Sequence, residues 1–359
     1  MSIDQIKMVN FRSHERTALT FSPGVNVIWG ENGSGKTSIL EAIYLLSLGR
    51  SFKTSRALET INHNANETLV EGLFTINREH ETICFAQSKE ARRKIKINGV
   101  DVKARDLIGK NPIVLLSPEE QKITKGFPGD RRKYLDKLYA TVSNKYLKTL
   151  TAYTRILKQR NALLKTEKTE PTLLVWDEQL AEAAVKVWSE KKELCQKFKL
   201  FLKEISKSYG QPGVSVILKT KQAPAEKKEI IEELKKAIKK DFLRKRTSVG
   251  PHTDGADFYY ENQALKRYGS QGEHKISLIL IKLAEYAFIK TETGKTPTLL
   301  LDDLFAKLDF ERSDAVLALL EKKAQTIITN TDLVDIERHG IDLNKPENKQ
   351  LHLERSCKN

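Results

Sequence analysis

Apolar and polar residues alternate in several short stretches of the first 125 residues, and this pattern predicts β-strands. The stretches lie between residues 3 and 21, at 68–74, at 81–85 and on both sides of Asn98-Gly99. Asn-Gly between two alternating segments is a strong hairpin signal. We therefore expect a small antiparallel sheet. Two continuously apolar runs, 25–29 and 112–116, predict buried strands.

From residue 131 the apolar spacing changes to three and four, which predicts helix. The first run predicts one helix of about 35 residues, about 50 Å long. After Glu170-Pro171 the same spacing continues to residue 205 and predicts a second long helix. Two such helices joined by a short turn pack antiparallel, so we expect a projecting arm. A strand-like stretch at 214–218 and a charged helix at 225–246 follow.

Beyond residue 246 the pattern again mixes strands and helices. Residues 257–260 and 265–268 flank Glu261-Asn262 and predict a hairpin, and a helix is expected at 275–290. Apolar strands are expected at 298–303 and 325–332. The predicted fold class is therefore α/β, with a mixed sheet, flanking helices and an inserted helical arm lobe. The expected domains are 1–125 and 247–359, two halves of one head, and 126–246, the arm.

A glycine-rich loop separates the strand at 25–29 from the helix that follows it. It reads G-x-x-x-x-G-K-[ST], the motif of phosphate-binding loops, and consists of Gly30, Glu31, Asn32, Gly33, Ser34, Gly35, Lys36 and Thr37. Such a loop turns backbone N–H groups and a helix N-terminus towards phosphates. Lys36 is expected to reach the phosphate oxygens and Thr37 to hold Mg²⁺. With Ser38, these residues predict an ATP site. The alternative is a glycine-rich turn that only caps a helix, and it does not explain why the motif lies between a strand and a helix.

Two further stretches carry candidate chemistry. Asp302 ends an apolar strand, where a phosphate-loop protein places its Mg²⁺-orienting carboxylate, and Asp303 beside it is positioned to polarise an attacking water. Ser270, Gln271 and Gly272 open a helix, and their hydroxyl and N–H groups suit an anion. Ser270 and Glu273 also fit an ordinary capping box, S-x-x-E. Taken alone, this stretch favours the cap.

Charge and composition narrow the function classes. The chain of 359 residues has a formal charge of +15. Residues 130–246 hold 29 Lys/Arg and 15 Asp/Glu, a net of +14, while the rest holds 33 and 32. This arm suits a polyanion such as DNA, although solvated lysine-rich helices explain the charge equally well. Three scattered cysteines and no apolar run of about 20 residues predict a cytoplasmic protein without membrane contact.

The order of these motifs resembles the ATP-binding-cassette heads of the SMC and Rad50 group. Within that group, detailed strings resemble the RecF family of bacterial recombination mediators. They lie at 10–14 (N-F-R-S-H), 24–37, 47–52, 117–119 (S-P-E), 131–136, 250–254 (G-P-H-T-D) and 299–309. The resemblance runs from the N-terminus to about residue 332 and is weakest in the arm.

This resemblance implies a weakly hydrolysing, Mg²⁺-dependent ATPase whose two heads sandwich two ATP molecules. Ser270, Gln271 and Gly272 would complete the γ-phosphate site of the partner, and Asp309 would lie at the dimer seam. The family binds duplex DNA near single-strand gaps and, with RecO and RecR, helps load RecA. Arg12 resembles a nucleotide-contacting arginine, although a surface arginine explains it nearly as well. Gln121 is a candidate metal or water contact.

Two departures from the family pattern and two other functions stay open. Glu273-His274 follows the signature glycine in place of the usual Gln-Gln or Gln-Arg, and 329–332 lacks the cassette's switch histidine. A transporter's nucleotide-binding subunit is one alternative, opposed by the missing histidine, the long arm and the roughly 260 residues between the phosphate loop and the acidic strand. A DNA-binding scaffold with a vestigial nucleotide site is the other, and absent ATP turnover with DNA present would favour it.

Overall fold

The structure, a computed structural model, describes residues 2–76, 79–91, 93–166, 170–208, 210, 213–219, 226–303, 324–334, 336 and 341–354. The chain forms two compact units, 1–121 with 285–359 and 122–284. Residues 247–284 thus group with the helical unit, whereas the predicted ranges place them in the head. The boundary at 284/285 falls inside helix α8 (Gln271–Thr293).

The first unit contains the predicted antiparallel sheet. Its strand order is β2-β1-β4-β5-β6-β7, and every pair of neighbours is antiparallel. The strands are β1 (Ser2–Phe11), β2 (His14–Thr20), β4 (Glu67–Ile76), β5 (Glu79–Ser88), β6 (Lys94–Ile97) and β7 (Val100–Asp101). The hairpin predicted at Asn98-Gly99 joins β6 and β7, which confirms that expectation.

A second sheet of the same unit is parallel throughout. Its order is β14-β3-β13-β12-β8. The strands are β3 (Val25–Trp29), β8 (Ile113–Leu116), β12 (Thr298–Asp302), β13 (Thr326–Asn330) and β14 (Lys349–His352). Four of them were predicted; β14 was not. Because all five are parallel, their carboxyl ends share one edge, where ligands bind in open α/β sheets.

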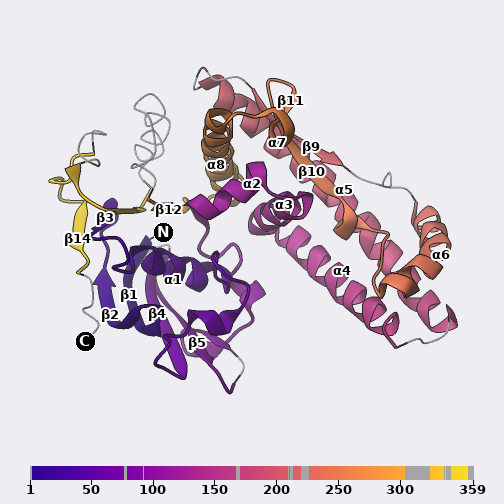
Figure 1. Cartoon of the computed structure of the whole chain (residues 1–359), viewed down its shortest axis with the longest axis horizontal. Helices are drawn as coiled ribbons and strands as arrows, with labels where there is room; N and C mark the ends of the chain where they lie inside the picture. The colour runs from indigo at the N-terminus through magenta and orange to yellow at the C-terminus, as the bar shows by residue number, and fades with distance from the viewer. Residues whose placement is uncertain are drawn as a thin grey trace. The chain divides into compact units, whose positions relative to one another are not determined.

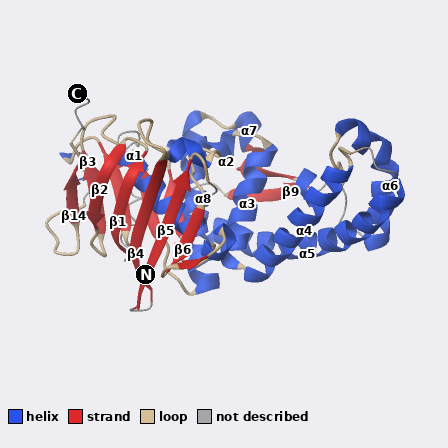
Figure 2. Cartoon of the chain, turned by 90° about the horizontal axis from the view of Figure 1, so that it is seen from below, coloured by secondary structure: helices blue, strands red, loops and turns tan. Residues whose placement is uncertain are grey.

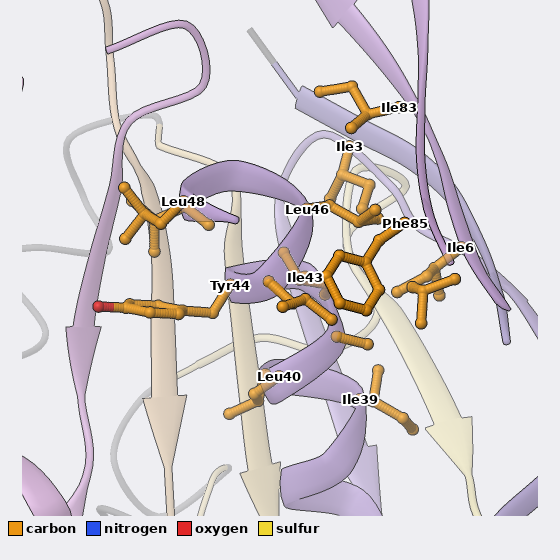
Figure 3. Close-up of a cluster of buried hydrophobic side chains, with 14 of the residues drawn as sticks. Ile3, Ile6, Ile39, Leu40, Ile43, Tyr44, Leu46, Leu48, Ile83 and Phe85 are labelled. Atoms are coloured by element: carbon orange, nitrogen blue, oxygen red, sulfur yellow. The ribbon is translucent and has the colours of Figure 1, made fainter. Parts of the chain in front are cut away.

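Helix α1 (Lys36–Leu48) packs against side chains of both sheets, and together they form one core. Figure 3 shows Ile39, Ile43 and Leu46 of this helix in a cluster with Ile6 and Phe85 of the antiparallel sheet. Residues of the parallel sheet, Ile28, Leu115, Leu300 and Ile327, belong to the same cluster. Nearly every residue of α1 is buried. This packing fixes the start of α1, where the phosphate loop ends.

The second unit begins with α2 (Lys122–Lys125) and α3 (Pro128–Val142). The prediction of one 35-residue helix was wrong, because α3 ends at Val142 and α4 (Asn144–Leu163) starts after Ser143. Ser143 has extended dihedrals, φ −132° and ψ 108°, and its Oγ accepts from the Tyr146 N–H as an N-cap. The apolar spacing continues across this break, so periodicity alone does not reveal it.

The second long helix, α5 (Glu170–Ser208), is as predicted, and it packs antiparallel to α4 (Figures 1 and 2). Thr149 of α4 donates to Glu190 at 3.2 Å, and Arg160 pairs with Asp177 at 2.6 Å. Partner numbers that fall along one helix as they rise along the other require opposite directions. The predicted helical arm is confirmed in this respect.

A three-stranded sheet in the order β11-β10-β9 completes the second unit. Its strands are β9 (Val214–Lys219), β10 (Gly255–Tyr260) and β11 (Gln263–Ala264), and the remaining helices are α6 (Lys227–Arg244) and α7 (Leu265–Tyr268). The hairpin around Glu261-Asn262 exists, but its second strand was predicted wrongly: Leu265–Tyr268 is helical. Only Leu265 of α7 is buried, so the segment has no strand face to pack.

In the described part of the chain, four short 3-10 helices connect these elements, at Ala57–Thr60, Ala104–Leu107, Pro118–Gln121 and Pro251–Thr253. Across the residues that the structure describes, none of the helices has the length and apolar character needed to cross a bilayer.

Candidate nucleotide-binding site

The phosphate loop needs glycine at two positions for reasons of space as well as conformation. Gly30 has φ 148° and Gly35 has φ 97°, values that side-chain-bearing residues rarely adopt. A Cβ on Gly30 would collide with the carbonyl oxygen of Leu353. A Cβ on Gly35 would lie 2.5 Å from Nε2 of His14. Neighbouring residues thus pack closely against the loop backbone at both glycines. A compact backbone of this kind can turn its N–H groups towards a phosphate.

Lys36 is the first residue of α1 and lies inside this cradle. Its side chain is 8% exposed, and its Nζ donates to the carbonyls of Gly30 at 2.6 Å and Glu31 at 2.8 Å. Burial lowers the pKa of Lys36, while the nearby carboxylates of Asp303 and Asp302 oppose that shift. The ammonium group thus has hydrogen-bond partners on the loop and acids close by.

Thr37 and Asp302 meet at the carboxyl edge of the parallel sheet. The Thr37 hydroxyl donates to Asp302 Oδ1 at 2.9 Å, and the Thr329 hydroxyl donates to the same oxygen at 2.8 Å. Burial raises the pKa of Asp302, and these two hydrogen bonds oppose the shift. Sequence reasoning did not assign Thr329 a role. The contact comes from the parallel strand register, which pairs Asp302 of β12 with Thr329 of β13.

Asp303 follows β12 with φ 50°, an uncommon left-handed conformation that short acidic side chains tolerate best. Its backbone N–H points at Thr329, 3.2 Å from the carbonyl and 3.1 Å from the hydroxyl. The Asp303 Oδ1 atom is buried and has no hydrogen-bond partner among the described residues. A buried acceptor of this kind calls for a water or a ligand.

These groups fit a magnesium nucleotide. Hydroxyl and carboxylate oxygens, as on Thr37 and Asp302, are the ligands that Mg²⁺ takes. The Lys36 ammonium and the N–H groups at the start of α1 suit phosphate oxygens. When bound, Mg²⁺-ATP would supply the phosphoanhydride bond to be hydrolysed. The buried Oδ1 of Asp303, which has no hydrogen-bond partner among the described residues, is a further oxygen acceptor beside these groups.

The remaining loop residues have mainly local contacts. The backbone N–H of Ser34 donates to Glu31 at 3.2 Å, and that of Ser38 donates to Gly35 at 2.9 Å. Ser34 Oγ is another buried atom without a hydrogen-bond partner among the described residues. Asn32 and Gly33 are exposed. Ser34 is therefore a second polar group available to a bound phosphate.

His14 contacts the phosphate loop through a hydrogen bond to Gly35, and it was not identified from the sequence as a site residue. Its Nε2 lies 3.1 Å from the Gly35 carbonyl, which can only accept, so Nε2 carries the proton and Nδ1 accepts from the Thr17 hydroxyl at 3.0 Å. Burial lowers the pKa of His14, against the Gly35 hydrogen bond, and keeps the ring neutral. No sequence signal marked this contact between residues 21 positions apart.

Arg12 is held by an acid of α1. It pairs with both oxygens of the fully buried Glu41, with Nη2 at 2.6 Å and Nε at 3.0 Å. Its Nη1 donates to the Glu59 carbonyl at 2.5 Å. A buried carboxylate needs such a partner, so this arginine has a structural role here. Its predicted contact with the nucleotide stays a prediction.

Two other predicted residues carry less information. Gln121 ends the 3-10 helix that follows β8, at the carboxyl edge of the parallel sheet, and its metal role stays a prediction. Asp309 lies outside the described residues.

The start of α8 lies in the second unit and forms a capping box. The Ser270 backbone N–H donates to Glu273 Oε2 at 2.6 Å, and the Glu273 N–H donates to Ser270 Oγ at 3.2 Å. These hydrogen bonds lower the pKa of Glu273. The capping box thus occupies the N–H groups of Ser270 and Glu273. Gln271 is exposed and Gly272 partly so.

Comparisons with known proteins agree along most of the chain. The family described as RecF/RecN/SMC N terminal domain matches residues 2–338. The DNA replication and repair protein RecF of Alkaliphilus oremlandii (strain OhILAs) is 34% identical over 98% of this chain and 98% of the relative. RecF of Clostridium botulinum (strain Langeland) is 33% identical over 94% and 95%.

Solved structures agree with the sequence relatives. A structure of the recombination mediator protein RecF with ATP in the RecFOR pathway is 31% identical and covers 93% of this chain and 92% of that one, with a TM-score of 0.86. An Smc head bound to the C-terminal winged-helix domain of ScpA is 17% identical, with a TM-score of 0.51 and coverages of 94% and 91%. The latter shows a shared fold alone, that of an ATP-binding-cassette head.

Proposed function

Since this chain belongs to the RecF family of DNA replication and repair proteins, we propose that it is a weak, Mg²⁺-dependent ATPase that works as an ATP-gated clamp on DNA. The observation that carries this proposal is the meeting of Thr37 and Asp302 beside Lys36. In this proposal ATP binding pairs two protomers, and the pair binds duplex DNA beside single-strand gaps in the cytoplasm. RecO and RecR are its partners in loading RecA.

The chain's own residues divide the ATPase work. Lys36 and the loop N–H groups orient the phosphates, and Thr37 and Asp302 hold the metal. Asp303 takes the proton of the attacking water on its buried Oδ1. Thr329 holds both acids, through the Asp302 carboxylate and the Asp303 backbone N–H. Asn330 Oδ1, buried and without a hydrogen-bond partner among the described residues, is a further acceptor at this edge.

Asp303→Asn is expected to leave ATP binding unchanged and slow hydrolysis about 10²- to 10⁴-fold, the usual contribution of a positioned general base. Asparagine tolerates φ 50° as well as aspartate does, so the backbone should persist. Single-turnover hydrolysis gives the rate, and a fluorescent ATP analogue gives the affinity. Turnover at the wild-type rate would exclude Asp303 as the water-polarising acid.

The α8 start is proposed to bind the γ-phosphate held by the partner protomer, through Ser270, Gln271 and Gly272. The Glu273 carboxylate accepts the Ser270 N–H and places a negative charge at this helix N-terminus, where it repels such a phosphate. The clamp is therefore expected to close more weakly than one without the acid.

Glu273→Gln should tighten ATP-dependent dimerisation about two- to five-fold, because glutamine keeps the capping box and removes the negative charge. The dimerisation constant from analytical ultracentrifugation with a non-hydrolysable ATP analogue measures this effect. Glu292→Gln, near the other end of α8, removes the same charge far from the phosphate and serves as the matched control. Weaker dimerisation of the Glu273 variant would instead assign the acid a supporting role at the seam.

The test of the whole proposal combines a labelled gapped duplex with light scattering, without nucleotide, with ADP and with a non-hydrolysable ATP analogue. The analogue alone should produce a dimer with tighter DNA binding. An unchanged mass and DNA affinity in all three conditions would mean that the nucleotide site is not coupled to DNA. The scaffold and transporter alternatives would then be reopened.

A further inference from the structure

Four lysines form a stripe along one side of α5. Lys192, Lys199, Lys203 and Lys207 are all exposed and, with Gln196 between the first two, follow steps of four, three, four and four. Such steps place side chains on one helix face. At 1.5 Å per residue the stripe is about 22 Å long.

The stripe lacks the internal neutralisation found elsewhere on the same helix. Among the residues that the structure describes, none of the four lysines has an ion-pair partner. Lys186 and Lys197 of α5, in contrast, pair with Glu182 at 2.8 Å and Glu193 at 3.8 Å, each four residues away. A solvated helix usually intersperses both signs in this way. The four unpaired charges thus remain available to an external anion.

The stripe also borders a cavity between α5 and the small sheet. Lys192, Gln196 and Lys199 line it from the helix, and Ile217 and Leu218 of β9 line it from the sheet. Its volume is about 250 Å³, smaller than the usual small-molecule site. Figure 1 shows β9 alongside α5 in this region. Lys192 and Lys199 therefore lie at a cavity whose β9 wall is apolar, and the buried Asp254 also lines it.

We propose that this face of α5, bounded by β9, binds the phosphate backbone of duplex DNA. This inference rests on the proposed function, and it assigns the DNA contact to one surface. Four unpaired ammonium groups over about 22 Å match a regular polyanion, since about six base pairs span that length at 3.4 Å each. An acidic peptide would need only a local cluster of charge.

The test compares two double variants of the full chain that remove the same charge from the same helix. Lys199→Gln with Lys203→Gln alters the stripe, and Lys186→Gln with Lys197→Gln alters the paired lysines. Binding to a labelled duplex of about 24 base pairs is followed by fluorescence anisotropy between about 50 and 200 mM KCl. Circular dichroism checks that both variants keep their helices, which glutamine supports well.

The stripe variant should bind duplex about ten- to a hundred-fold more weakly near 100 mM salt, and its salt slope should fall by about two. The control variant should keep both the affinity and the slope of the wild type. Equal losses in both variants, or no loss in either, would overturn the assignment. The assignment would also be overturned if the stripe variant lost affinity for a polyglutamate peptide while its affinity for the duplex stayed unchanged. A wild-type chain that binds no DNA would contradict the proposed function itself.

Discussion

Replacing Lys36 with alanine should weaken ATP binding about 10- to 150-fold. The ammonium group is buried and donates to two loop carbonyls at 2.6 and 2.8 Å, and in the proposed site it contacts the phosphates. A hydrogen bond to a charged group contributes about 1.5–3 kcal/mol, which corresponds to this range. Equilibrium titration with a fluorescent ATP analogue measures the affinity.

The control for this change is Lys7→Ala, which removes an exposed lysine from β1 of the same unit. That variant should bind ATP as the wild type does. Thermal unfolding without nucleotide separates lost affinity from lost structure. If Lys36→Ala melted normally and kept its nucleotide affinity, the ATP site would have to lie elsewhere in the chain.

The second large effect is expected at Arg160, which lies at the centre of a buried charge cluster. Its side chain is 0% exposed and joins three helices, through Asp177 of α5 at 2.6 Å and Asp241 of α6 at 2.7 Å. It also donates to the Thr247 hydroxyl at 2.9 Å. Arg160→Met leaves two buried carboxylates without their partner. Breaking a buried pair in this way costs about 3–5 kcal/mol.

Urea unfolding followed by tryptophan fluorescence measures this loss, because Trp176 and Trp188 lie on α5 and report on the helical unit. Arg160→Lys keeps one charge but not the fork of donors, so an intermediate loss is expected. Lys186→Met removes an exposed partner of Glu182 and should change little. A methionine variant as stable as the wild type would show that the aspartates are protonated or solvated, and that the cluster does not hold the helices together.

Local sequence patterns predicted the elements around the site well. The phosphate loop was found with its strand and helix because its glycines, lysine and threonine lie within eight residues. The break at Ser143 was missed because the apolar residues keep their phase across it. Strand β14 was missed because its sequence has little apolar character, yet its pairing with β3 places Leu353 against Gly30. The roles of the individual site residues in ATP binding and hydrolysis stay predictions.

The sequence by itself determined the nucleotide loop, the two acids after an apolar strand and the positive charge of the helical segment, since each is a property of neighbouring residues. Only the tertiary structure decided which groups meet. Thr329 reaches Asp302 across the β12–β13 register, and His14 reaches Gly35 from another strand. It also separated paired lysines from the unpaired stripe on α5. These contacts depend on strand register and helix packing, which arise from burial summed over the whole chain, and no short stretch of sequence encodes them.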